Sequence, residues 1–152
     1  MQIISNSQED TMALGKKIAR GLKQGMIIIL TGDLGAGKTK FTEGVLDYFG
    51  LTDEISSPTF TIVNEYQTEN LNIYHFDLYR LEDIDEFYAI GGEEYFDKGA
   101  CIIEWGKMIE HDIDQNYLKI TFKYDEQDEN KRIIEIEKIG DIDIDIASLQ
   151  NS

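Results

Sequence analysis

The sequence predicts an α/β fold: a single domain in which helices flank a mixed, partly parallel central sheet. The apolar run at residues 26–31 leads into a glycine-rich loop and then into a segment with helical spacing, as when a buried parallel strand precedes a helix. Two pairs of β-type segments, within residues 60–76 and 117–138, are each separated by a short polar stretch, as in antiparallel hairpins. A chain of 152 residues has the length of one domain.

The individual elements follow from capping signals and periodicity. Ser7 and Asp10 have the spacing of a capping box, so a first helix is expected to begin there and to end at Gly25. A second helix is expected to follow the glycine loop and to stop at Gly50, and a short acidic helix is expected at residues 81–90. The expected strands are residues 26–31, 60–66, 71–76, 100–104, 117–124 and 132–138.

The C-terminal residues differ from the rest in composition. Residues 141–146 read DIDIDI, which suits an edge strand or a tail, and we expect a frayed tail because chain ends commonly fray. The expected organisation is a domain at residues 1–139 followed by an acidic tail at residues 140–152.

Charge and composition limit the classes of partner. The net charge of −16 opposes direct binding to DNA or RNA, which normally requires a basic surface. No segment has the length of a membrane span or the pattern of a signal peptide, so we expect a cytoplasmic protein without membrane contact. The single cysteine, Cys101, excludes an intramolecular disulfide and is expected to be buried and inert.

Four basic residues stand out on the first predicted helix. They are Lys16, Lys17, Arg20 and Lys23, and three of them recur at helical spacing. We interpret this stripe as a solvated face, with a docking surface as the alternative.

The strongest chemical signal is the segment GDLGAGKT, a full match to the phosphate-binding loop G-x-x-x-x-G-K-[ST]. In such loops the backbone N–H groups surround phosphates, the lysine reaches the terminal phosphates and the last hydroxyl binds Mg²⁺. A strand before the loop and a helix after it provide the required context. The nucleotide-binding residues predicted here are Gly32, Asp33, Leu34, Gly35, Ala36, Gly37, Lys38 and Thr39.

Hydrolysis needs further groups, because Mg²⁺ requires more oxygen ligands and the attacking water must be positioned. Glu104 ends the predicted strand 100–104 and Asp77 follows the predicted strand 71–76, and both are candidates for metal binding and catalysis. Arg80 is a candidate for stabilising transition-state charge, with an ion pair to Glu82 or another surface acid as the alternative. The hydroxyl groups of the segment Ser57, Pro58, Thr59 could approach the terminal phosphate as a switch.

Two neighbouring residues have more than one interpretation. Trp105 beside Glu104 is expected to pack in the core, with a nucleotide or partner contact as the alternative. His75 is interpreted as a strand residue rather than a base, because no other histidine or cysteine clusters with it in the sequence.

Taken in order, the motifs GDLGAGKT, SPTF, HFDLYR and Glu104-Trp105 resemble the bacterial TsaE family, formerly called YjeE. The resemblance covers nearly the whole chain apart from the tail. It implies a compact phosphate-loop (P-loop) ATPase fold that uses ATP and Mg²⁺. It also implies a cytoplasmic role with the partners TsaB and TsaD in threonylcarbamoyl modification of the adenosine that follows the anticodon in tRNAs reading A-starting codons. Contact with tRNA would then be indirect, through that complex.

The resemblance also implies residue roles. Lys38 and Thr39 would bind phosphate and Mg²⁺, Thr59 would lie in a first switch, Asp77 and Arg80 in a second, and Glu104 would assist metal binding and hydrolysis. Thr11, Lys40 and Trp105 complete the expected nucleotide-binding set. Lys40 and Gly106 depart from the commoner family pattern, and we expect neither to abolish activity.

Other nucleotide-dependent functions remain as alternatives. The chain lacks the Asn-Lys-x-Asp and Asp-x-x-Gly motifs of regulatory GTPases and the signature loop of transporter ATPases. A phosphotransferase acting on a small molecule or protein uses the same phosphate cradle. A module whose bound nucleotide state controls assembly is a third interpretation.

Overall fold

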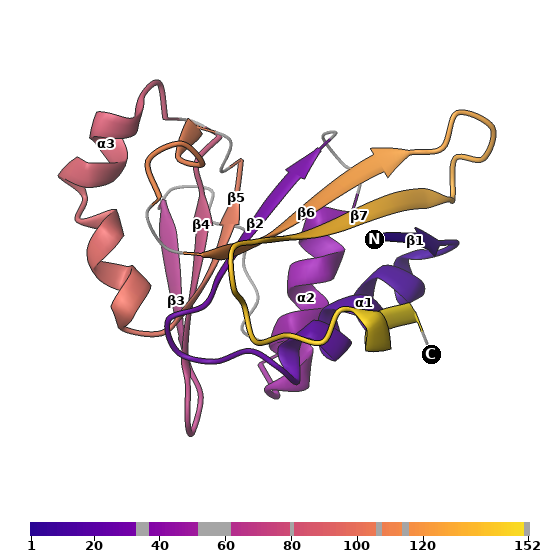
Figure 1. Cartoon of the computed structure of the whole chain (residues 1–152), viewed down its shortest axis with the longest axis horizontal. Helices are drawn as coiled ribbons and strands as arrows, with labels where there is room; N and C mark the ends of the chain where they lie inside the picture. Colours follow the sequence, from indigo (N-terminus) through magenta and orange to yellow (C-terminus); the bar gives the residue numbers. More distant parts are fainter. Residues whose placement is uncertain (33–36, 52–61, 80, 106–107, 114–115, 151–152) are drawn as a thin grey trace.

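The computed structural model describes residues 1–32, 37–51, 62–79, 81–105, 108–113 and 116–150, and the fold within them is α/β, as predicted (Figure 1). The described strands are β1 (Gln2–Ser5), β2 (Ile27–Gly32), β3 (Val63–Gln67), β4 (Asn72–Asp77), β5 (Ala100–Glu104), β6 (Tyr117–Tyr124) and β7 (Arg132–Ile139). The described helices are α1 (Gln8–Ala19), α2 (Lys38–Tyr48) and α3 (Ile84–Ala89), together with the 3-10 helices η2 (Gly92–Asp97) and η4 (Ala147–Gln150).

These strands form one mixed sheet in the order β1-β7-β6-β2-β5-β4-β3. The centre is parallel: β2 pairs with β5 and β6, and β4 pairs with β5. The edges are antiparallel, because β3–β4 and β6–β7 are the two predicted hairpins and β1 pairs with β7. The predicted mixed, partly parallel sheet is therefore confirmed.

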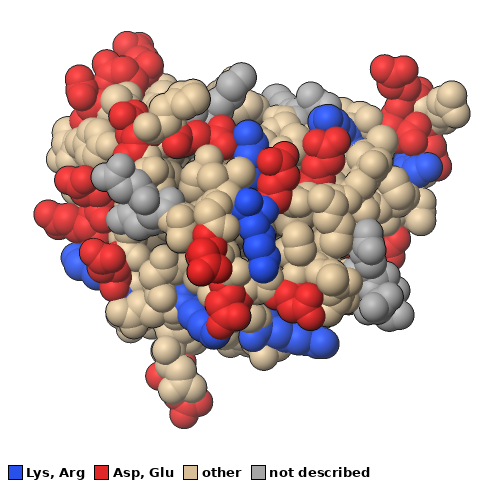
Figure 2. Space-filling model, viewed as in Figure 1, with Lys and Arg blue, Asp and Glu red and all other residues tan. Residues whose placement is uncertain are grey.

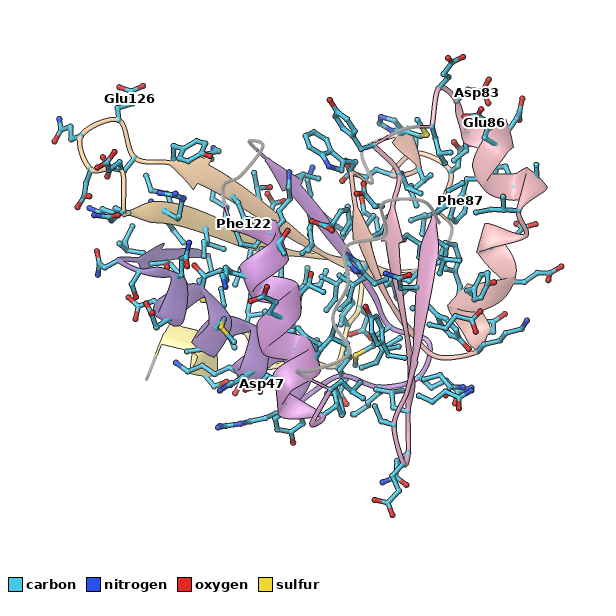
Figure 3. All side chains as sticks on the ribbon, turned by 180° about the vertical axis from the view of Figure 1, so that it is seen from behind. Asp47, Asp83, Glu86, Phe87, Phe122 and Glu126 are labelled. Carbon is cyan, nitrogen blue, oxygen red and sulfur yellow. The ribbon has the colours of Figure 1, made fainter. Side chains whose placement is uncertain are left out.

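Both faces of the central sheet are covered, which explains the continuous apolar sequence of β2. Ile28 and Leu30 belong to a core that includes residues of α1 and α2, whereas Ile27 and Ile29 belong to a second core under α3 and η2. Figure 3 shows Phe122 beside α2 and Phe87 between α3 and the sheet. The first four residues of β2, Ile27 to Leu30, are thus buried, as expected for a parallel central strand.

The two long helices pack directly against each other. A Cβ atom on Gly44 of α2 would lie 2.1 Å from the carbonyl oxygen of Met12 in α1, so the backbones approach closely at this point. Ser7 is the N-cap of α1, and its hydroxyl accepts the N–H of Asp10. The predicted start of this helix is correct, and its close contact with α2 brings Ser7 and Thr11 to the same cavity as Gly37 and Lys38.

Both ends of the chain differ from expectation. The strand β1 was not predicted, because it has only four residues and its partner β7 is far away in the sequence, with Ser5 opposite Arg132 and Gln2 opposite Glu135. Helix α1 ends at Ala19 rather than at Gly25. The segment expected to fray instead packs against the core, where Ile142, Ile144 and Leu149 are buried. Alternating isoleucines, which suggested a strand or a tail, here supply apolar contacts to the domain.

Charge is spread unevenly over the surface. Figure 2 shows acidic side chains gathered at the upper left, over α3, and at the upper right, over the end of the β6–β7 hairpin. Of the four basic residues expected on the first helix, Lys16 lies in α1 and pairs with Asp47 at 2.7 Å, whereas Lys23 lies beyond its end and pairs with Asp143. These pairs with acids of the same chain favour the interpretation as a solvated face. Across the described residues, no helix combines the length and the apolar character needed to span a membrane.

Candidate nucleotide-binding site

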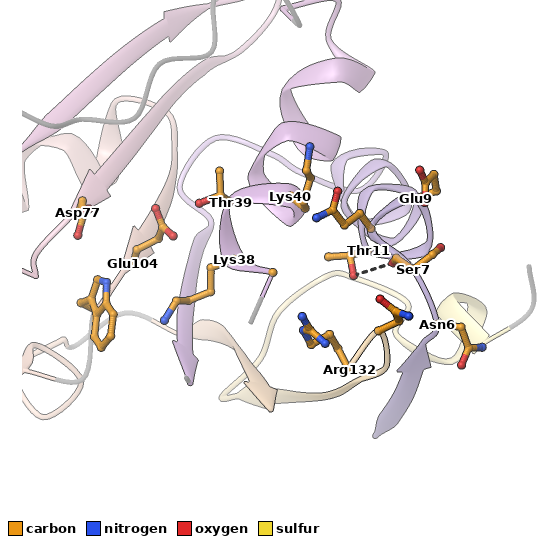
Figure 4. A pocket seen from close by; sticks show the side chains of 14 residues that line it. Asn6, Ser7, Glu9, Thr11, Lys38, Thr39, Lys40, Asp77, Glu104 and Arg132 are labelled. Carbon is orange, nitrogen blue, oxygen red and sulfur yellow. Dashed lines mark hydrogen bonds between the residues drawn. The ribbon is translucent and has the colours of Figure 1, made fainter. Parts of the chain in front are cut away.

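A cavity of about 820 Å³ opens where β2 leads into α2, beside the carboxyl ends of β4 and β5. Figure 4 shows Asp77 and Glu104 on one side of Lys38. The opposite side is lined by Ser7, Thr11 and Arg132. Carboxyl ends of parallel strands and the N-terminus of the next helix are where α/β proteins bind nucleotides.

Lys38 lies at the centre of this cavity and is 5% exposed. Its ammonium nitrogen donates a hydrogen bond to the carbonyl oxygen of Gly32 at 3.0 Å. The same nitrogen lies 3.8 Å from the centre of the Trp105 ring. The indole therefore faces the site as well as packing, which supports the alternative interpretation of Trp105.

The backbone beside the loop has the geometry that requires glycine. Gly32 has φ 119°, and a Cβ atom there would lie 2.0 Å from the carbonyl oxygen of Phe122. Gly37, the N-cap of α2, has φ 110° and no side-chain capping hydrogen bond. Gly37, Lys38 and Thr39 line the cavity, so the N-terminus of α2 borders it, and a helix N-terminus favours an anion such as phosphate.

Asp77 and Glu104 are direct neighbours in the parallel register of β4 and β5. The N–H of Tyr79 donates to one oxygen of Asp77 at 3.0 Å. Partial burial raises the pKa of Asp77, and the hydrogen bond from Tyr79 opposes that rise, while nearby Glu104 adds to it. The sequence predicts a carboxylate at the end of each strand, and the sheet order makes these two strand ends adjacent.

These oxygen donors suit Mg²⁺. Thr39, in the first turn of α2, lines the same cavity as Asp77 and Glu104. Within the described part of the chain, no group of three or more His, Cys, Asp or Glu side chains could hold a metal alone. Magnesium in phosphate sites uses one or two carboxylates and completes its shell with phosphate oxygens and water, so the donor set fits.

One contact to Glu104 was not anticipated. The Nε2 atom of His75 lies 2.6 Å from Oε2 of Glu104, and both side chains are buried. His75 is a residue of β4, as interpreted from the sequence, but it also touches a candidate catalytic group. The sequence feature that could have predicted this contact is the position of His75 two residues before Asp77, which puts both side chains on the same face of the strand.

The N-terminal wall of the cavity comes from the start of α1. Thr11 is buried and its hydroxyl lies 2.7 Å from that of Ser5. Gly37 lies against Thr11, since a Cβ on Gly37 would be 3.5 Å from the Thr11 methyl group. Lys40 also lines the cavity and pairs with Glu43 at 2.9 Å. The structure thus brings Thr11 and Lys40 to the same site as Lys38.

Several lining residues were missed by sequence reasoning. Asn6 and Ser7 precede α1, while Asn130 and Arg132 come from the β6–β7 hairpin. Arg132 donates to the carbonyl oxygens of Glu129 and Lys131 and lies 4.5 Å from the Tyr124 ring. No local pattern marks Asn130 and Arg132 as site residues, because only the sheet order brings the hairpin to the cavity at the N-terminus of α2.

Some predicted site residues lie outside the described residues. They are Asp33, Leu34, Gly35 and Ala36 of the loop, Ser57, Pro58 and Thr59 of the switch segment, and Arg80.

Comparison with known proteins identifies the family. The model of the family "Threonylcarbamoyl adenosine biosynthesis protein TsaE" matches residues 5–134. The chain belongs to the TsaE family. The match runs from the end of β1 into β7, so it includes every described residue of the cavity and leaves out the tail.

Individual relatives agree with this assignment. The tRNA threonylcarbamoyladenosine biosynthesis protein TsaE of Bacillus subtilis is 44% identical over 124 residues, covering 81% of this chain and 77% of that protein. TsaE of Rickettsia felis is 40% identical over 135 residues, covering 88% and 78%. The crystal structure of Bacillus subtilis YdiB superposes with a TM-score of 0.72 at 34% identity, covering 92% of this chain and 86% of that one. The family resemblance expected from the motifs is confirmed, and with it a place in tRNA threonylcarbamoyladenosine biosynthesis.

Proposed function

We propose that the chain binds ATP with Mg²⁺ and hydrolyses it, as a cytoplasmic subunit that acts on a TsaB–TsaD complex during threonylcarbamoyl modification of tRNA. The observation that carries the proposal is the convergence of Lys38, Thr39, Asp77 and Glu104 on one cavity at the N-terminus of α2. In phosphoryl transfer the protein mainly positions groups and stabilises charge, and these residues are of the kinds required.

The lysine and the helix would bind the phosphates. The Lys38 ammonium would exchange its contact with the Gly32 carbonyl for the more strongly charged phosphate oxygens. The N–H groups of the first turn of α2, which lines the cavity, would donate to the same phosphates. The opposite end of the cavity, lined by Ser7, Thr11 and Arg132, would take the nucleoside.

The carboxylate end would carry the hydrolytic step. Thr39, Glu104 and Asp77 would hold Mg²⁺, which neutralises charge on the phosphates when bound. Glu104 would also orient the attacking water, since it lies beside the end of the strand that leads into the loop. Arg80 would stabilise transition-state charge, and Ser57 to Thr59 would respond to the terminal phosphate.

The surface charge supports a protein complex as the immediate partner. A chain with a net charge of −16 would be repelled by tRNA, so contact with tRNA would pass through TsaB and TsaD.

The proposal is tested by measuring ADP and inorganic phosphate released from ATP, with and without purified TsaB and TsaD. We expect equal amounts of both products and faster turnover with the two partners. ADP without inorganic phosphate would indicate phosphoryl transfer to an acceptor instead. Full multiple-turnover tRNA modification by TsaB and TsaD without this chain would contradict the proposed role.

The active carboxylate is tested with Glu104→Gln. This variant should bind ATP but hydrolyse it at least about 100-fold more slowly, the usual size of such catalytic contributions. Glu94→Gln removes the same charge from the exposed surface of η2 and should hydrolyse at the wild-type rate. Unchanged turnover in Glu104→Gln would remove Glu104 from the mechanism.

A further inference from the structure

We propose that His75 is a positioning residue: its Nε2–H holds one oxygen of Glu104, so that the other oxygen is presented to the magnesium and water end of the nucleotide cavity. This inference rests on the proposed function, because it assigns a role within the same site.

The sheet places the two residues side by side. Asp77 lies opposite Glu104 in the parallel register of β4 and β5. His75 is two residues before Asp77, so both side chains leave the same face of β4. The result is a contact of 2.6 Å between Nε2 of His75 and Oε2 of Glu104.

Burial strengthens the hydrogen bond between His75 and Glu104. The side chains of His75 and Glu104 are only 6% and 10% exposed. A carboxylate can only accept hydrogen bonds, so the imidazole nitrogen must be the donor when Glu104 is ionised. Hydrogen bonds to charged groups contribute more than neutral ones, and water competes poorly for a buried pair.

The contact also limits how Glu104 can act. With Oε2 engaged by His75, the remaining oxygen Oε1 is the one offered to a ligand in the cavity. A glutamate side chain has several rotatable bonds, and fixing it in advance avoids an ordering cost when the ligand binds. Hydrogen bonds behind metal-binding carboxylates tune metal affinity in this way.

The arrangement does not suit His75 as a direct ligand of nucleotide or metal, nor as a residue that only fills space in the core. The ring does not line the cavity, whereas Glu104 does, so Glu104 lies between His75 and any ligand. Where the same face of β4 only fills space in the core, it carries an apolar residue, the fully buried Ile73. A buried imidazole costs stability unless a polar partner satisfies it, and Glu104 is that partner.

Two amide variants separate positioning from packing. In His75→Gln the amide nitrogen lies near the position of Nε2 and can still donate to Glu104. His75→Asn carries the same amide on a side chain one carbon shorter, which cannot reach. Thermal unfolding of both variants, and of His75→Leu, reports any loss of stability.

The decisive measurement is Mn²⁺ binding to the ADP complex by electron paramagnetic resonance, beside ADP binding without metal. We expect His75→Asn to bind Mn²⁺ about 10-fold or more weakly, the usual effect of losing such a supporting contact. His75→Gln should regain most of that affinity, and both should bind ADP without metal as the wild type does.

Equal Mn²⁺ affinity in His75→Asn and the wild type would overturn the proposal. So would an equal loss in His75→Gln and His75→Asn, because the effect would then come from packing alone. The proposed function is decided separately, by phosphate release from wild-type protein with TsaB and TsaD. Loss of that activity with an intact Mn²⁺ difference would leave His75 as a positioning residue in a nucleotide site that does not hydrolyse.

Discussion

The ammonium nitrogen of Lys38 lies 3.8 Å from the centre of the indole ring of Trp105, the residue that follows β5. Trp105 has φ 61°, an uncommon backbone conformation for a bulky residue, and its N–H donates to the carbonyl oxygen of Leu30. The bend after Glu104 thereby turns the indole over the lysine. A local outlier that serves a contact in the site is a frequent feature of functional sites.

Because Trp105 is the only tryptophan, its fluorescence should report nucleotide binding. Phosphate drawing Lys38 away from the ring should change the intrinsic emission. Lys38→Met should weaken ATP binding about 10- to 100-fold, since hydrogen bonds to charged groups contribute about 1.5–3 kcal/mol each. Isothermal titration calorimetry provides the affinity independently of fluorescence.

A second lysine over an aromatic ring is the matched control. Lys98 lies 5.4 Å from the centre of the Tyr95 ring, is exposed at the end of η2 and does not line the cavity. Lys98→Met should bind ATP with wild-type affinity. If both methionine variants lost affinity to the same extent, the special role of Lys38 would be refuted.

Gly32→Ala should destabilise the fold as well as the loop. The added Cβ would lie 2.0 Å from the Phe122 carbonyl, in a backbone conformation that alanine avoids. Gly50→Ala is the control, because Gly50 has φ 79° and nothing within 4 Å of the added atom. Urea unfolding should show a loss of about 1–2 kcal/mol for Gly50→Ala and at least twice that for Gly32→Ala. Equal losses of unfolding free energy in the two variants would mean that the backbone at Phe122 of β6 moves aside without cost.

Asp77→Asn should stabilise the protein at neutral pH in the absence of nucleotide and metal. Burial raises the pKa of Asp77 above 3.8, so its stabilising contribution is fully present below pH 3.8 and is lost as the pH rises through the folded-state pKa. Asparagine keeps an oxygen for the Tyr79 N–H but carries no charge. Urea midpoints from pH 7 down to pH 4 should show an advantage of the variant that shrinks as the pH falls. An advantage that grows toward pH 4 would contradict this assignment.

Cys101 should resist thiol reagents in the native protein. Burial raises the pKa of its thiol from 9.0 to about 12, so little thiolate exists at pH 8. Neutral Cys101 therefore contributes stability below pH 9 that is lost between pH 9 and 12. Labelling by a disulfide reagent at pH 8 should be at least about 100-fold slower than in guanidinium chloride, where the only cysteine is exposed. Equal rates would show that β5 opens readily.

The sequence by itself determined the chemistry of the loop and the type of most central elements. The continuous apolar run of β2, the glycines and Lys38 carry a local pattern, because a buried parallel strand and a phosphate loop each require particular neighbouring residues. The carboxylates Asp77 and Glu104 were recognisable for the same reason, since each ends an apolar strand.

Only the tertiary structure decided which distant residues meet at that loop. The pairing of β1 with β7 and the burial of Ile142 and Ile144 depend on partners far away in the sequence, and no local signal marks them. The same holds for Arg132 in the cavity and for His75 against Glu104. Strand order and register set these contacts, and register follows from how all the strands pack together rather than from any one segment.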